Sequence, residues 1–438
     1  MAQRTFLHAA DLHLDSPLLR LDLGADPVAA ELVRGATRSA FVRLVDHALR
    51  RQVAFVVLAG DLWDGEWQDV HTGLWFLRQL GRLAAAAIPV VFVRGNHDAA
   101  SEVTPLLRWP EHVHELATAA PETLRLEALR VALHGQGFAE RHVTANLAAH
   151  YPPPVPGWLN VGVLHTALDG AADHAPYAPC TVADLAARGY DYWALGHVHA
   201  FGVRNEAPWI VYPGCLQGRH VNETGAKGAV EVDYAGDRVL AVRHVPLDVV
   251  RWARPTVDLT AATSRNDAED RIVHRLRDLA AGVDPGVGLI VVRPRLRGGA
   301  AAAAALLADR RGAADRIAGL AAGLNPTVIV EDLDGGLDDP PPRPLHATSD
   351  LGDDAVADLA HRLDALARDE TVAAELAAWV EQVRRRTPAE AQAQLETGPL
   401  AALFAGDTAR ILADRCGAAH SLLVDDPAET APDAPRGP

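Results

Sequence analysis

Five short polar segments in the first half of the chain each follow a run of apolar residues. They are D-L-H at 11–13, G-D at 60–61, G-N-H-D at 95–98, the lone His165, and G-H-V-H at 196–199. Such apolar runs are typical of strands buried on both faces, in a sheet covered by helices. The carboxyl ends of parallel strands converge at the edge where ligands bind in α/β folds. The pattern therefore predicts an α/β fold with one shared polar site at a sheet edge.

The five segments offer carboxylates, imidazoles and one amide, which suit a pair of metal ions. Asp61 is the natural bridging carboxylate, because it ends a buried strand after a glycine that permits a tight turn. Two metal ions about 3.5–4 Å apart can stabilise both the attacking and the leaving oxygen of a phosphate ester. The candidate ligands are Asp11, His13, Asp61, Asn96, His165, His197 and His199.

His97 and Asp98 are the candidate catalytic residues. His97 follows the candidate ligand Asn96, and we expect it to meet the substrate phosphate or to protonate the leaving oxygen. Asp98 could orient its ring. A single D-x-H or G-D is common and usually structural, but five such segments in this order favour a metal site. For His8, within the first strand, and for His134 we favour structural roles.

The chain of 438 residues is too long for one compact core, so we expect several domains. Apolar and polar patterns predict an α/β domain at 1–250 and a smaller α/β domain at 251–337. A Pro-rich linker and helical region follow at 338–424. The tail at 425–438 is rich in Pro, Ala and acidic residues, and we expect it to be disordered.

Composition limits the environment and the partners. The formal charge of −16 argues against a generally basic coat, although a local arginine-rich face is still compatible with it. The three cysteines lie far apart without a C-x-x-C motif, so we expect neither disulfides nor a thiolate zinc site. No segment reaches the roughly 18 apolar residues of a membrane span. We therefore expect a cytoplasmic protein without membrane contacts.

The motifs resemble those of the calcineurin-like metallophosphoesterases. Within that family, H-A-A-D-L-H-L-D-S-P-L (8–18), A-G-D-L-W-D-G (59–65), R-G-N-H-D-A-A-S (94–101) and Y-P-G-C-L-Q-G-R-H-V-N-E-T-G-A-K-G (212–228) resemble bacterial DNA repair exonucleases of the SbcD class, and most closely the YhaO-type branch. The resemblance covers the first domain and is weak afterwards. It implies a four-layer α/β/β/α sandwich with a smaller α/β capping domain and C-terminal helices.

The resemblance also implies roles for individual residues. One metal ion would be bound by Asp11, His13, Asp61 and His199. The other would be bound by Asp61, Asn96, His165 and His197. His97 would be the catalytic histidine, and manganese the preferred metal. Cys215 stands where the family is expected to have Asn, a departure outside the inferred ligands.

The resemblance implies a homodimer that degrades DNA from its ends and pairs with an SMC-like coiled-coil ATPase. The chain has no G-x-x-x-x-G-K-[ST] loop, so ATP use would belong to that partner. Helices within 353–415 are our candidate docking site for it, and a plain helical subdomain is the alternative.

Arginines near the site should supply the DNA contacts. One candidate pair is Arg219 with His220. Another group is Arg293, Arg295 and Arg297, which at spacing two would share one strand face. A solvated sheet face is the alternative for that group.

Two other functions use the same motifs. The first is a small-molecule phosphodiesterase or phosphatase, although such a substrate needs no large cap. The second is a DNA-end-binding scaffold with minor nuclease activity, although a scaffold has no need of His97.

Overall fold

The computed structural model describes residues 2–16, 27–64, 70–99, 107–169, 177–298 and 300–335, with 372, 374 and 377–382. The predicted linker from residue 338, the tail at 425–438 and most of the candidate docking helices lie outside these residues. Residues 1–336 form one compact unit and residues 337–438 a second. The following description concerns the first unit.

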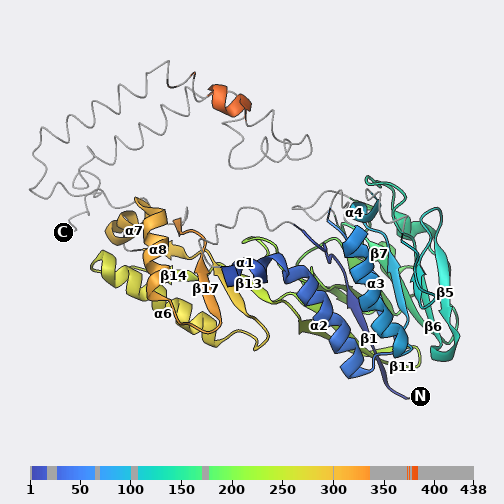
Figure 1. Cartoon of the computed structure of the whole chain (residues 1–438). Helices are drawn as coiled ribbons and strands as arrows, with labels where there is room; N and C mark the ends of the chain where they lie inside the picture. The colour runs from blue at the N-terminus through green and yellow to red at the C-terminus, as the bar shows by residue number, and fades with distance from the viewer. Residues whose placement is uncertain are drawn as a thin grey trace, which may run out of the picture. The chain divides into compact units, whose positions relative to one another are not determined.

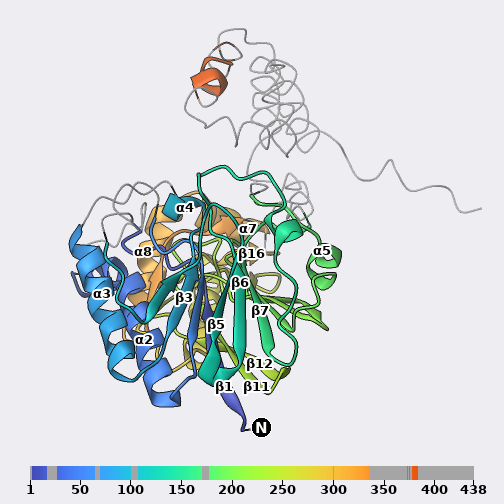
Figure 2. The ribbon, with the colours of Figure 1, turned by 90° about the vertical axis from the view of Figure 1, so that its right-hand side faces the viewer.

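Two six-stranded sheets form the centre of this unit (Figures 1 and 2). The first has the order β12 (Arg238–Pro246), β11 (Gly228–Ala235), β1 (Arg4–Ala9), β2 (Val56–Ala59), β3 (Val90–Val93), β4 (Val113–Glu115). The second has the order β5 (Glu122–Leu126), β6 (Val131–Gly135), β7 (Leu159–His165), β8 (Tyr192–Gly196), β10 (Trp209–Tyr212), β9 (Gly202–Glu206). The strands β1–β4 are parallel to one another, and so are β6, β7, β8 and β10. The polar segments therefore leave the two sheets at equivalent strand ends.

The sheets pack face to face, and helices cover their outer faces. Phe6 and Val57 of the first sheet share a core with Val163 of the second. On the other face of the first sheet, α2 (Ala36–Arg51) and α3 (Val70–Ala85) bury Phe41 and Phe76. The short helices η3 (Leu147–His150) and α5 (Val182–Ala186) pack on the outer face of the second sheet. This is the predicted four-layer α/β/β/α order, and the fold class is confirmed.

A smaller α/β module follows. Its two three-stranded parallel sheets have the orders β13 (Val250–Ala253), β15 (Leu289–Val292), β17 (Thr327–Val330) and β14 (Thr256–Asp258), β16 (Arg295–Arg297), β18 (Asp334–Gly335). Its helices are α6 (Arg265–Ala281), α7 (Ala300–Leu307) and α8 (Arg310–Leu320). They share one apolar core with these strands.

The apolar pattern of the sequence favours one strand at 287–297 and helices at 300–323 and 27–51, but the structure divides each of these elements in two. The predicted strand at 287–297 is broken before Arg295, because Pro294 has no N–H for a ladder. The predicted Ala-rich helix at 300–323 is broken at Asp309, whose side chain caps α8 by accepting from the Gly312 N–H. The predicted helix at 27–51 is broken at Gly35 into α1 (Pro27–Arg34) and α2.

The helix α1 joins the first module to the second (Figure 1). Its Ala29 and Val33 pack in one cluster with Trp252, Leu289 and Val291 of the smaller module.

Candidate metal centre

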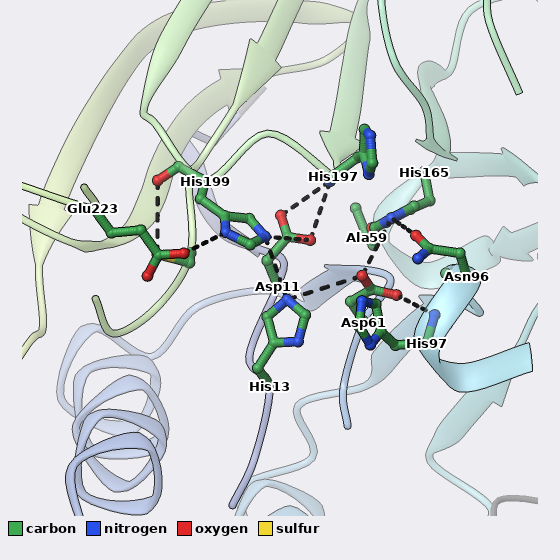
Figure 3. A network of polar contacts seen from close by, with 12 residues as sticks. Asp11, His13, Ala59, Asp61, Asn96, His97, His165, His197, His199 and Glu223 are labelled. Atoms are coloured by element: carbon green, nitrogen blue, oxygen red, sulfur yellow. Dashed lines mark hydrogen bonds and ion pairs between the residues drawn. The ribbon is translucent and has the colours of Figure 1, made fainter. Parts of the chain in front are cut away.

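The structure brings the predicted ligands together where β1, β2, β7 and β8 end and where α4 (Asn96–Ala99) begins (Figure 3). Ligand atoms of Asp11, His13 and His199 lie within 4.8 Å of one another. Those of Asp11, Asp61 and His165 form a second such group.

The remaining two predicted ligands border these groups. The Asn96 Oδ1 atom lies 3.0 Å from His165 Nε2. The backbone N–H of His197 donates to both Asp11 carboxylate oxygens, at 3.1 and 3.0 Å, and its ring centre is 5.2 Å from that of His165.

Three imidazoles turn Nδ1 outward to an oxygen and Nε2 inward. His165 Nδ1 donates to the Ala59 carbonyl at 3.0 Å, and His199 Nδ1 donates to Glu223 Oε1 at 2.6 Å. His13 Nδ1 lies 3.3 Å from Asp64 Oδ1. An outer oxygen that holds the Nδ1 proton leaves Nε2 with its lone pair, the form that binds a metal ion. Inside, the Nε2 atoms of His13 and His199 face each other at 3.3 Å. A donor set that aims lone pairs and carboxylates at one space fits divalent cations.

Metal binding requires ionised carboxylates and neutral imidazoles, and the pKa shifts of Asp61 and His13 favour these states. Burial alone would raise the pKa of Asp61, but His165, His13 and His97 lower it to about 2. Burial, helped by the Arg219 charge, lowers the pKa of His13 to about 3. Burial would also lower the pKa of His199, yet the Glu223 hydrogen bond and the Asp11 charge raise it overall. Burial raises the pKa of Asp11, a carboxylate that a bound cation would hold ionised.

The ligand-bearing turns have an uncommon backbone. Four of the candidate ligands have positive φ angles: Asp11 (51°), His13 (42°), Asp61 (53°) and His197 (105°). Positive φ is uncommon in residues other than Gly, and such strain clusters at functional sites.

Close approach also dictates glycine beside the ligands. A Cβ on Gly95 would lie 2.2 Å from Asp61 Oδ1, and one on Gly196 would lie 1.9 Å from the Ala59 carbonyl oxygen. The glycines of these motifs are therefore required by packing.

The structure gives Asp98 a different role from the predicted one. Its carboxylate accepts hydrogen bonds from the backbone N–H groups of Gly95, Leu62 and Trp63, at 3.0, 2.9 and 3.3 Å. It thereby ties the G-N-H-D turn to the turn after β2. The carboxylate beside the His97 ring is that of Asp64, whose Oδ1 lies 3.6 Å from His97 Nδ1. His97 itself donates its backbone N–H to Asp61 Oδ1 at 2.9 Å.

Arg219 lies beside the centre, as predicted, but its guanidinium binds carboxylates of this chain. It lies 3.2 Å from Glu223 Oε1 and 3.4 Å from Asp64 Oδ1, and it is largely buried. A guanidinium held by two carboxylates is poorly placed to bind a phosphate, so the prediction of a DNA contact is corrected for Arg219. His220 is about half exposed, with Nε2 3.5 Å from Glu223.

The three arginines of the smaller module do not share one strand. Arg293 follows β15, and its guanidinium pairs with Glu331 at 3.1 Å. Arg295 and Arg297 belong to β16, in the other sheet. The break at Pro294 separates them, so the expected shared face is wrong for Arg293. Arg297 is exposed.

Asp64 and Glu223 are the residues that sequence reasoning missed. The spacing G-D-x-x-D within 60–64 was a usable signal for Asp64, because it places a second carboxylate beyond Asp61. Glu223 is within the segment 212–228 but carries no spacing that links it to His199. Cys215 is fully buried, with its thiol 3.6 Å from the His199 carbonyl oxygen.

The histidines expected to be structural are so. His8 is buried between the Tyr192 hydroxyl and the Leu195 carbonyl, each 3.0 Å from one ring nitrogen. His134 lies between Thr123 and Asn160.

Within the described residues, no helix combines the length and apolar character needed to cross a bilayer.

Comparisons with known proteins match two separate parts of the first unit. Residues 4–201 match the calcineurin-like phosphoesterase family, and residues 252–335 match the middle domain of metallophosphoesterase YhaO. A Bacillus subtilis protein named uncharacterized metallophosphoesterase YhaO is 38% identical over 263 residues, which cover 59% of this chain and 64% of that protein. The DNA double-strand break repair protein Mre11 of Methanopyrus kandleri is 26% identical over 214 residues, covering 44% of each chain.

The chain thus spans less than two thirds of the length of these relatives. Among solved structures, a dimetal phosphatase from Danio rerio is similar at 13% identity and a TM-score of 0.33, covering 56% of this chain and 99% of that one. The likeness to that structure is too distant to bear on function. The two family matches agree with the four-layer fold: residues 4–201 are similar to the calcineurin-like phosphoesterases, and residues 252–335 are similar to the middle domain of metallophosphoesterase YhaO.

Proposed function

We propose that the chain hydrolyses DNA phosphodiesters as an exonuclease with two divalent metal ions, manganese foremost. The convergence of two carboxylates, three inward-facing imidazoles and the Asn96 amide at one sheet edge carries this proposal. Bound there, the metal ions would supply hydroxide at neutral pH and stabilise charge on the phosphate oxygens.

His97 would act on the leaving group. Its backbone N–H is fixed on Asp61, which places the imidazole at the border of the metal centre. Its side chain is 29% exposed, so substrate can reach it. Asp64, 3.6 Å from Nδ1, can hold the ring with Nε2 directed at the substrate, where it can hold a proton for the leaving oxygen.

The name of one relative supports DNA as the substrate. The Methanopyrus kandleri protein is named for double-strand break repair, and its match covers 44% of this chain. Exposed arginines such as Arg297, with His220, would contact the phosphates. A homodimer and an SMC-like ATPase partner are part of the proposal.

The test is nucleotide release from end-labelled linear duplex DNA with manganese, magnesium or EDTA. Wild type should release nucleotides with manganese and not with EDTA. His97→Ala should lose about 100-fold or more of the rate while keeping its metal content, because we assign His97 to the leaving group and not to a metal ion. Asp61→Ala should lose both the activity and the bound metal. His150→Ala, which alters an exposed histidine of η3, is the matched control.

Three outcomes would contradict parts of this proposal. Wild type that cleaves bis-p-nitrophenyl phosphate but leaves DNA intact would favour the small-molecule phosphodiesterase. DNA-end binding without turnover of either substrate would favour the scaffold. Loss of a metal ion in His97→Ala would overturn the role given to His97.

A further inference from the structure

His199 is fixed by hydrogen bonds both at its ring and at its backbone carbonyl. The ring donates from Nδ1 to Glu223 Oε1 at 2.6 Å. The backbone carbonyl of His199 accepts from the Lys227 ammonium at 2.7 Å and from the Cys215 N–H at 3.3 Å.

Glu223 is built into the fold. It is 6% exposed, and Oε2 accepts from the Arg219 backbone N–H at 2.7 Å. The Arg219 guanidinium donates to Oε1 at 3.2 Å. A carboxylate that is paired with a guanidinium and a backbone N–H accepts hydrogen bonds, so the Nδ1 proton of His199 points at it.

We propose that Glu223 is a positioning residue that fixes His199 as a metal ligand, with Arg219 and Lys227 holding the pair in place. This inference rests on the proposed metal centre. A carboxylate on Nδ1 fixes both the tautomer and the ring orientation, and it makes Nε2 a stronger donor. Glu223 thereby acts on the ion bound by Asp11, His13 and His199, and not on the ion beside Asn96 and His165.

A third metal site at Glu223 is a weaker interpretation of the same residues. His199, Cys215 and Glu223 have ligand atoms within 4.8 Å of one another. However, the Arg219 guanidinium lies 3.3 Å from His199 Nδ1, where a cation would have to bind. Burial also raises the pKa of the Cys215 thiol, which opposes a thiolate. The site is therefore arranged around a hydrogen bond.

The test is manganese binding to the metal-free full chain by calorimetric titration, with metal content after dialysis as a second readout. Wild type should show two classes of site. Glu223→Gln should weaken one class by about 10- to 100-fold and leave the other near its wild-type value. Glu223→Asp, which keeps the charge but is shorter, should recover part of the loss.

Glu231→Gln is the matched control. Glu231 is also buried and ionised, and it accepts from one histidine and two arginines, but it lies on β11 away from the centre. The control should bind manganese like wild type. The inference would be overturned if Glu223→Gln kept both classes of manganese site at wild-type affinity. It would also be overturned if Glu223→Gln and Glu231→Gln weakened both classes equally. Wild type that binds no metal would instead overturn the proposed function, and the inference with it.

Discussion

Asp64 connects several residues that the chemistry needs. Its carboxylate lies 3.3 Å from His13 Nδ1 and 3.6 Å from His97 Nδ1, and it accepts from the Ser16 hydroxyl at 2.7 Å. Burial would raise its pKa, but the hydrogen bonds of His13 and Ser16 and the Arg219 charge lower it. Asp64 is therefore ionised beside both a candidate ligand and the candidate acid.

Asp64→Asn should reduce the rate of phosphodiester hydrolysis by about 10-fold or more, because the amide holds the His97 ring less firmly. If Asp64 acts through His97, most of this loss should vanish when Asp64→Asn is made in the His97→Ala variant. Rates of the two single variants and the double variant give the answer. Fully multiplicative losses would mean that Asp64 acts independently of His97.

His8 predicts a dependence of stability on pH. Burial lowers its pKa to about 3, against 6.5 for the free side chain. Below pH 6.5 the unfolded chain therefore takes up a proton that the folded chain refuses, and stability falls as the pH falls from 6.5 toward 3. The slope should be about 1.4 kcal/mol per pH unit for this one group.

Urea unfolding of metal-free wild type and His8→Leu, at several pH values from 7 to 4, measures this slope. His13 contributes to both proteins, so their difference isolates His8. Parallel pH profiles for the two proteins would contradict the prediction.

Elements meet closely behind the ligand turns, and glycine makes this possible. Gly196 ends β8 directly against the Ala59 carbonyl of β2, so the contact joins the two sheets at the metal centre. A side chain there would push the strand ends apart and displace the histidines that follow.

Gly196→Ala should destabilise the protein by about 1–3 kcal/mol or more and lower manganese affinity. Gly81→Ala is the matched control, since a Cβ there meets nothing within 4 Å and Gly81 lies inside α3. That change should instead stabilise by about 0.5–1 kcal/mol. Thermal unfolding of both variants, with and without manganese, distinguishes them. A Gly196→Ala protein as stable as wild type would show that the strand ends can separate freely.

The sequence predicted those elements whose signals are local. Strands before the ligands were recognisable because burial on both faces leaves continuous apolar runs, and α6 has a Ser264 cap and Gly282 at its end. The breaks at Gly35, Pro294 and Asp309 were missed, because an apolar pattern continues across them.

In the metal centre, too, residues with a local sequence signal were predicted and residues without one were missed. The predicted ligands lie in short motifs that are visible in the sequence. The roles of Asp64 and Glu223 depend on which distant segments meet, such as Asp64 with Arg219, 155 residues apart. Asp98 was misassigned because its three backbone partners carry no sequence signal.

At the scale of the whole unit, the two modules are joined by polar as well as apolar contacts. Arg43 of α2 donates to the backbone carbonyls of Asp248 and Gly286, which flank β13 and β15 of the smaller module. Arg251 of β13 pairs with Asp248 and Asp284 beside these carbonyls, on the side of the smaller module. The polar part of the joint therefore depends on the Arg43 guanidinium, which satisfies two loop carbonyls.

Arg43→Met should weaken this joint by about 1–3 kcal/mol, since it leaves two carbonyls without a charged donor. Calorimetry should then resolve a separate, earlier transition for the smaller module. Arg297→Met, which changes an exposed arginine of that module, should unfold like wild type. A single unchanged transition in Arg43→Met would show that the α1 cluster alone holds the modules together.

The fixed position of Lys227 has a practical consequence. It is the single lysine among 41 basic residues, and it is buried beneath His199. Lysine acetylation therefore cannot change the affinity of this protein for nucleic acid by removing an exposed positive charge. Amine-directed cross-linkers will likewise capture few neighbours from its side chains. Cross-linking experiments that map binding partners should therefore use reagents directed at carboxylates or arginines. Histidine aside, the basic side chains that recognise phosphates should all be arginines.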